Sequence, residues 1–100
     1  ALEYIEQHYA ENLSLNVLAN EVHMNPYYFS SFFKKSTGKN FKDYVNQVRL
    51  KHAVELLLNT DQKVYEIAME VGFGDARAFN DAFQKAYGET PAGYRKKLKS

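Results

Sequence analysis

The sequence predicts an all-α protein with seven helices, organised as two helix-turn-helix subdomains joined by a long central helix. Three observations predict this class. Apolar residues recur at helical spacing, and no stretch shows the period-two alternation of a β-strand. The helix predicted over residues 41–59 changes its apolar face halfway along. The segments on either side of that helix, residues 1–40 and 60–100, resemble each other.

The predicted central helix carries two apolar faces instead of one. At about 100° per residue, its first apolar set clusters on one side and consists of Phe41, Tyr44, Val45 and Val48. The second set lies on nearly the opposite side and consists of Leu50, Ala53, Val54 and Leu57. A surface helix normally keeps one apolar stripe. We therefore expect its two halves to pack into two different cores.

Three short helices are predicted before the central one. Apolar spacing marks the first over residues 2–10. Ser14 is a good N-cap for the second, and Asn25 followed by Pro26 is a strong start signal for the third. Gly38 ends the third, because glycine readily adopts the left-handed conformation after a helix. In the third helix we expect three residues to pack inward, Phe29, Phe32 and Phe33.

Three further helices follow the central one. The fifth is marked by apolar spacing and is stopped by Gly72. Asp75 caps the sixth, and Thr90 caps the seventh. We expect the seventh to fray into a solvated basic tail over residues 95–99. The alternative is that these basic residues contact RNA polymerase or bind phosphate.

Two residue patterns occur twice in the chain. One recurs after 49 residues, as Leu18-Ala19-x-x-Val22 and Ile67-Ala68-x-x-Val71. The other recurs after 50 residues, as Phe29, Phe33, Gly38 and Tyr44 and then as Phe79, Phe83, Gly88 and Tyr94. Each copy has helix-turn-helix spacing, and the second has one extra residue at its turn. His23 and Gly72 occupy the turns, where we expect a positive φ.

The second helix of each copy, residues 26–37 and 76–87, has an outer face that suits contacts with DNA bases. The outer residues of the first are Tyr27, Ser30, Ser31 and Lys34, and those of the second are Arg77, Asn80, Asp81 and Gln84. Arginine can bridge guanine, asparagine can bridge adenine, and aspartate accepts from cytosine. Tyrosine and serine can contact bases, a thymine methyl group or phosphate. The alternative is that both faces are merely solvated.

The central helix would be about 27 Å long at 1.5 Å per residue. Successive major grooves on one face of DNA are about 34 Å apart. One chain could therefore place both second helices in successive major grooves of double-stranded DNA. For phosphate contacts we expect lysines and helix N-termini, contributed by Ser14, Lys34, Lys35, Lys39 and Lys63.

Composition argues against several other classes. The net charge is +1, but residues 1–33 carry −4 and the remainder carries +5. The chain has no cysteine, no apolar run of the roughly 20 residues that span a bilayer, and no visible signal peptide, so we expect a cytoplasmic location and no membrane partner. Its three histidines are scattered, and it has no nucleophile motif or Gly-rich phosphate loop. We expect a protein that is not an enzyme and has no metal or cofactor.

Two segments carry a resemblance to a known family. Residues 64–75 read VYEIAMEVGFGD and are followed by Phe79, Phe83, Gly88, Thr90-Pro91 and Tyr94-Arg95; residues 23–38 read HMNPYYFSSFFKKSTG. The whole chain resembles the C-terminal DNA-binding domain of the AraC/XylS family of bacterial transcription regulators. The sequences of these two segments are similar to those of members whose N-terminal domain is a response-regulator receiver or a ligand sensor.

The resemblance implies a sequence-specific promoter binder, usually an activator that contacts RNA polymerase, with its sensor domain outside this sequence. By position it implies base reading by Tyr27, Ser30 and Ser31 and by Ala76, Arg77, Asn80 and Asp81. The chain departs from the family at Ser31 and Asp81, where members often have Arg or Lys. Asp81 would then face a cytosine amine or pair with Arg77. The alternative is a non-catalytic protein-interaction domain with only one functional DNA-reading unit.

Overall fold

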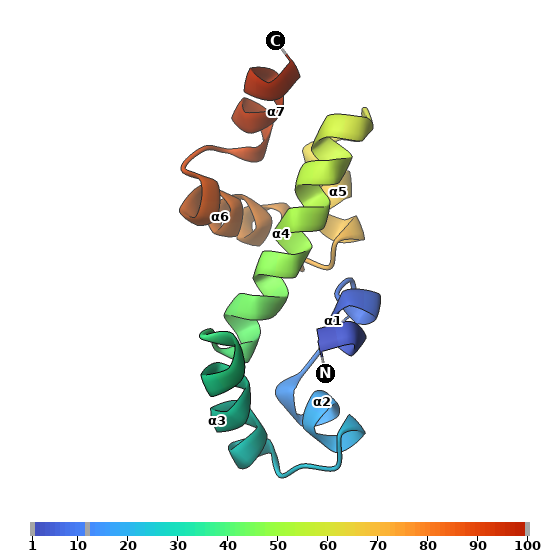
Figure 1. Ribbon diagram of the computed structural model, residues 1–100. Helices are drawn as coiled ribbons and strands as arrows, with labels where there is room; N and C mark the ends of the chain where they lie inside the picture. Colours follow the sequence, from blue (N-terminus) through green and yellow to red (C-terminus); the bar gives the residue numbers. More distant parts are fainter. Residues whose placement is uncertain (1, 12, 100) are drawn as a thin grey trace. The chain divides into compact units, whose positions relative to one another are not determined.

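The computed structural model describes residues 2–11 and 13–99, which form seven α-helices and no strand (Figure 1). The helices are α1 (Leu2–His8), α2 (Leu15–Glu21), α3 (Pro26–Thr37), α4 (Phe41–Asn59), α5 (Val64–Glu70), α6 (Ala76–Tyr87) and α7 (Pro91–Lys99). The all-α prediction is confirmed. Two predicted boundaries are wrong, because α1 ends at His8 rather than at residue 10 and α7 continues through Lys99 instead of fraying. Among the described residues, no helix combines the length and apolar character needed to cross a membrane.

Helix α4 belongs to two compact units. One unit ends at Val48 and the other begins at Arg49, in the middle of the helix. In its first half the buried residues are Val45 and Val48, which join the core of the first unit. In its second half the buried residues are Leu50, Ala53 and Leu57. The burial agrees with the change of apolar face that the sequence predicts near Arg49.

The core of the first unit is built from four helices, namely α1, α2, α3 and the first half of α4. Its buried members are Ile5, Leu18, Ala19, Phe29, Phe33, Val45 and Val48. The prediction that Phe32 packs inward is wrong, because 58% of its surface is exposed. Phe29 and Phe33 are one turn apart and share the buried face of α3, whereas Phe32 lies about 100° round the helix from Phe33. The buried face of α3 is therefore narrower than the sequence suggests.

The core of the second unit repeats the aromatic geometry of the first. The rings of Phe33 and Tyr44 are T-shaped with centroids 5.3 Å apart, and 50 residues later those of Phe83 and Tyr94 are T-shaped at 5.4 Å. Each aromatic pair joins the second helix of its unit to the helix that follows it. Such edge-to-face pairs stabilise a core beyond the area they bury. The sequence repeat thus corresponds to a repeat of packing.

The two turns also repeat, hydrogen bond for hydrogen bond. In the first unit, the Met24 N–H donates to the Ala19 carbonyl at 2.8 Å; in the second, the Phe73 N–H donates to the Ala68 carbonyl at 2.9 Å. These bonds end α2 and α5 in the same way and lead into α3 and α6, which pack on them. The residue before each donor has the predicted positive φ, 57° at His23 and 103° at Gly72.

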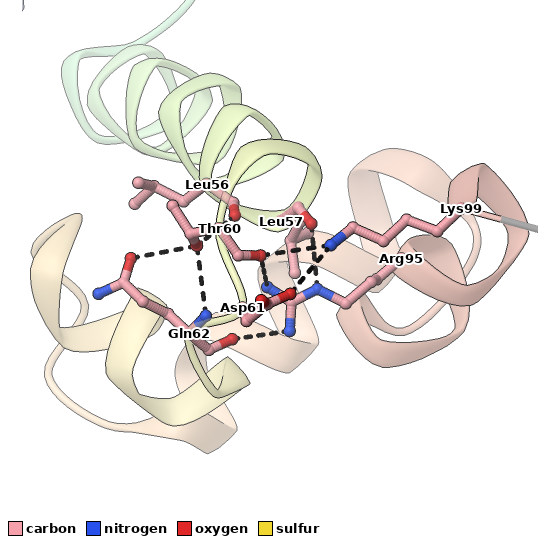
Figure 2. Close-up of polar contacts among 7 residues, drawn as sticks. All are labelled: Leu56, Leu57, Thr60, Asp61, Gln62, Arg95 and Lys99. Carbon is pink, nitrogen blue, oxygen red and sulfur yellow. Dashed lines mark hydrogen bonds and ion pairs between the residues drawn. The ribbon is translucent and has the colours of Figure 1, made fainter.

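Arg95 fastens α7 to the C-terminal end of α4 (Figure 2). Its guanidinium donates three hydrogen bonds to backbone carbonyls, those of Leu57 at 3.0 Å, Thr60 at 3.2 Å and Gln62 at 2.7 Å. The last carbonyls of a helix have no partner within the helix, and a cation there also complements the helix dipole. The expectation of a solvated tail is therefore wrong for Arg95, because the end of α4 offers acceptors that only the folded unit assembles.

Candidate nucleic-acid interface

Helix α3 begins with a cap that fixes its first turn. The Asn25 side chain accepts a hydrogen bond from the Tyr27 N–H at 2.9 Å, and Pro26 occupies the first helical position. Because Phe29 and Phe33 bury one face, the opposite face is exposed. All four side chains predicted to lie on that face are exposed, namely Tyr27, Ser30, Ser31 and Lys34. The structure therefore brings the predicted α3 residues together on one accessible helix.

Tyr28 belongs to the same exposed turn, although sequence reasoning did not select it. The exposed fractions of Tyr27 and Tyr28 are 76% and 67%, and their rings pack edge to face with centroids 5.7 Å apart. The comparison of the two copies did not point to Tyr28, because the matching residue in the second copy is Ala78, which has no aromatic ring. The signal that could have found it is the pair of adjacent tyrosines directly after a helix cap.

Helix α6 begins with the predicted aspartate cap. The Asp75 carboxylate accepts a hydrogen bond from the Ala78 N–H at 2.7 Å. Arg77, Asp81 and Gln84 are exposed, whereas the predicted base readers Ala76 and Asn80 are half-buried. The α6 surface that is most accessible to a ligand therefore centres on three side chains, those of Arg77, Asp81 and Gln84.

Arg77 and Asp81 lie one turn apart, so they could form an ion pair along the helix. Within residues 2–11 and 13–99, however, no ion pair joins their charged groups. Both side chains therefore keep their hydrogen-bonding groups available. Of the two roles that the sequence leaves open for Asp81, the structure does not form the pairing with Arg77.

The predicted phosphate-contacting residues have different surroundings. Lys34 and Lys35 are exposed in the last turn of α3. The Lys39 ammonium group donates to the Gln47 side chain on α4. The Ser14 hydroxyl accepts a hydrogen bond from the Val17 N–H at 3.1 Å and so caps α2. The α3 lysines are thus the most directly available cations of the set.

Lys63 is the N-cap residue of α5, and the Glu66 carboxylate already lies at this helix N-terminus. Its backbone N–H donates to the Glu66 carboxylate at 2.8 Å. A carboxylate at this position favours the helix, because it complements the positive end of the helix dipole. The same charge opposes the approach of a phosphate, so any phosphate contact at this end depends on the exposed Lys63 side chain.

Two ionisable side chains of the second unit have shifted pKa values. Burial lowers the pKa of the Arg49 guanidinium, which lies with its Cζ 5.8 Å from the centre of the Phe73 ring. Burial, and then the neighbouring Tyr94, raise the pKa of Tyr87. Both groups pack against aromatic residues of the second unit. They therefore contribute to its packing and lie outside the exposed faces described above.

Comparison with known proteins agrees with this architecture. A family model described as a helix-turn-helix domain matches residues 18–97. The regulatory protein PocR of Salmonella typhimurium is 39% identical over 98 residues, which are 98% of this chain and 32% of PocR. The chain therefore spans about one third of that relative.

Two solved structures are similar over most of their length. The C-terminal domain of the two-component response regulator YesN from Fusobacterium nucleatum is 41% identical, with a TM-score of 0.89 and coverage of 94% of this chain and 92% of that domain. The DNA-binding domain of AdpA, solved in complex with a target DNA, is 27% identical, with a TM-score of 0.91 and coverage of 95% and 86%.

The fold and these matches define a helix-turn-helix DNA-binding domain of a transcription regulator. The chain belongs to the AraC-type family of such domains. This family assignment confirms the resemblance seen in the sequence. It also agrees with the expected class, because the domain that the relatives share binds DNA and is not an enzyme.

Proposed function

We propose that this domain binds double-stranded promoter DNA in a sequence-specific manner, with α3 and α6 in successive major grooves. In this proposal residues 1–40 and 60–100 are two reading subdomains and residues 41–59 are the linker helix. The length of α4 supports it, because 19 residues at 1.5 Å each give about 28 Å, close to the roughly 34 Å repeat of the major groove. The observation that carries the proposal is the repeated turn and cap geometry, which presents an exposed second helix in each unit.

The proposed base readers are side chains of these two helices, all of them exposed except the half-buried Ala76 and Asn80. Tyr27, Ser30 and Ser31 would read bases from α3, and Ala76, Arg77, Asn80 and Asp81 would read from α6. Arg77 is the strongest candidate, because its guanidinium is exposed and can bridge guanine O6 and N7. Asp81 would accept from a cytosine amine, a role that its unpaired carboxylate supports.

Lysine side chains would neutralise phosphates around each groove, and Ser14 would contact a phosphate at the N-terminus of α2. The proposed set is Ser14, Lys34, Lys35, Lys39 and Lys63. If about four to six phosphates are neutralised, the logarithm of affinity should fall against the logarithm of salt concentration with a slope of about −4 to −5. A slope near zero would remove the electrostatic part of the proposal.

The proposed role in the whole protein is that of an activator in the bacterial cytoplasm. The DNA-binding domain would be joined to a receiver or sensor domain outside this sequence and would contact RNA polymerase. The similarity to the C-terminal domain of a response regulator supports a receiver as the attached domain. The assignment as an activator rests on the family resemblance.

The decisive experiment is selection of binding sites from a random duplex library, followed by footprinting on the selected site. Two protected stretches one helical turn apart are expected. A footprint confined to one groove would favour the second candidate, a helical protein-interaction domain in which only one unit reads DNA. Recovery of no preferred sequence would overturn sequence-specific binding by either unit.

Substitution of Arg77 tests the base-reading assignment on the same duplexes. Arg77→Ala should weaken binding to the selected site by about 1–3 kcal/mol and relax the preference at one base pair, because one bidentate contact is lost. Lys85→Ala, at an exposed cation in the last turn of the same helix, is the matched control and should leave base preference unchanged. An equal loss on selected and random DNA would assign Arg77 to phosphate.

A further inference from the structure

The outer faces of α3 and α6 differ in chemistry at matched positions, although the two units repeat the same packing. Where α6 presents Arg77 and Asp81, α3 presents Tyr27 and Ser31, 50 residues earlier. Arginine and aspartate make directional hydrogen bonds to base edges, and arginine can do so bidentately. The first turn of α3 has neither residue, and its two tyrosines carry one hydroxyl each beside a large ring. The first turn of α3 therefore offers a different kind of contact from the one that α6 offers.

The first turn of α3 offers an apolar surface in place of a hydrogen-bonding fork. We call Tyr27 and Tyr28 the aromatic pair. Both rings are mainly exposed, at 76% and 67%, and they pack against each other edge to face at an interplanar angle of 82°. This geometry is the one that aromatic pairs prefer. Because each ring restrains the other, the pair loses less conformational freedom when a ligand covers it.

The position of the aromatic pair also suits contact with base edges. In a helix-turn-helix unit the N-terminal residues of the second helix are those that reach the bases. The Asn25 cap holds the backbone of Tyr27 at this end of α3, through the 2.9 Å bond to its N–H. The lysines Lys34 and Lys35 lie in the last turn, where they can contact the phosphate backbone.

We propose that the aromatic pair contacts thymine C5-methyl groups, so that α3 selects T·A base pairs by apolar contact while α6 selects through hydrogen bonds. In the major groove the thymine methyl is the apolar group that distinguishes one base pair from the others. The ring faces supply apolar area without requiring a hydrogen-bond partner on the base. This inference rests on the proposed function, since it assumes that α3 enters a major groove.

The test replaces each thymine of the selected duplex, one at a time, by deoxyuridine, which lacks only the methyl group. Burial of one methyl-sized group corresponds to about a fourfold change in affinity. We expect the wild-type domain to bind about fourfold more weakly when the contacted thymine is replaced. Replacement of thymines elsewhere in the duplex should change affinity less than twofold, which provides an internal control.

Variants of the aromatic pair assign the effect to a ring or to a hydroxyl group. Tyr27→Phe and Tyr28→Phe keep the rings and should retain the sensitivity to deoxyuridine. The double substitution of both residues by alanine should abolish that sensitivity, because no ring remains to contact the methyl. Tyr65→Ala, at a tyrosine on α5 whose exposed fraction is 56%, is the matched control and should bind like the wild type. Circular dichroism checks that each variant is folded.

Three results would overturn the inference. One is equal binding of the thymine and deoxyuridine duplexes by the wild-type domain, a measurement that needs no variant. Another is a loss of affinity in the Phe variants as large as in the alanine variant, which would assign the contact to a hydroxyl group. A third is full sensitivity to deoxyuridine in the alanine variant. Failure of the proposed function itself would look different, since no preferred duplex would then be selected.

Discussion

Removal of the Arg95 side chain should destabilise the domain strongly, although the residue lies in a basic segment near the end of the sequence. Arg95 donates three hydrogen bonds to carbonyls at the end of α4 and in the segment that follows it (Figure 2). At roughly 1 kcal/mol net for each bond, Arg95→Ala would cost about 3 kcal/mol. The Thr60 carbonyl keeps a bond from the Lys99 ammonium at 3.4 Å, which reduces the expected loss to about 2–3 kcal/mol.

Urea unfolding followed by circular dichroism would measure this loss. Arg95→Lys should recover part of it, because lysine keeps the charge but lacks the planar fork that reaches three acceptors. Lys96→Ala is the matched control, since Lys96 is the adjacent exposed cation on α7, and it should change the free energy of unfolding by less than about 0.5 kcal/mol. If Arg95→Ala were as stable as the wild type but bound DNA with a smaller salt slope, Arg95 would be a phosphate contact and the reasoning would be refuted.

The two turns, and the packing of Tyr87 against Tyr94, yield two further predictions. Gly72→Val should lower the free energy of unfolding by about 1–3 kcal/mol, because the backbone φ at this position is 103°. His23→Gly, at a φ of 57°, should cost far less. Equal melting temperatures for the Gly72 variant and the wild type would contradict the first prediction. The folded state holds the Tyr87 proton more tightly than the unfolded chain does, so its contribution to stability is complete below the ordinary tyrosine pKa of 10.0 and is lost as pH rises through the raised value. Tyr87→Phe should therefore lose less stability than the wild type in alkaline urea titrations.

The parts of the fold that follow local rules could be predicted from the sequence. The caps at Asn25 and Asp75 and the stops at Gly38 and Gly88 depend on a few adjacent residues, and they mark α3 and α6 correctly. The change of face in α4 depends on periodicity alone. The repeat added independent evidence, because the turn and second helix of the first unit have counterparts 49 or 50 residues away.

Features that depend on tertiary contacts could not be predicted in this way. Phe32 is as apolar as its buried neighbours, and only the narrow contact of α3 with its core leaves it exposed. Arg95 reads as part of a basic run, since its acceptors are carbonyls more than 30 residues away in the chain. For the candidate site, spacing predicted that Tyr27 and Arg77 would be exposed, but the half-burial of Asn80 depends on packing.

The difference between the two units lies where a change of residue costs the fold least. The buried phenylalanines, the turn hydrogen bonds and the aromatic contacts recur in both units, and they pack or lead into the second helix of each. Tyr27 and Arg77 occupy matched positions on exposed faces, where substitutions normally change stability by less than about 0.5 kcal/mol. Stability therefore leaves these residues free to differ, and under the proposed function the difference would follow from the bases that each face contacts. If both units read DNA as proposed, two copies of one scaffold would recognise two different base sequences without any change in how either copy folds.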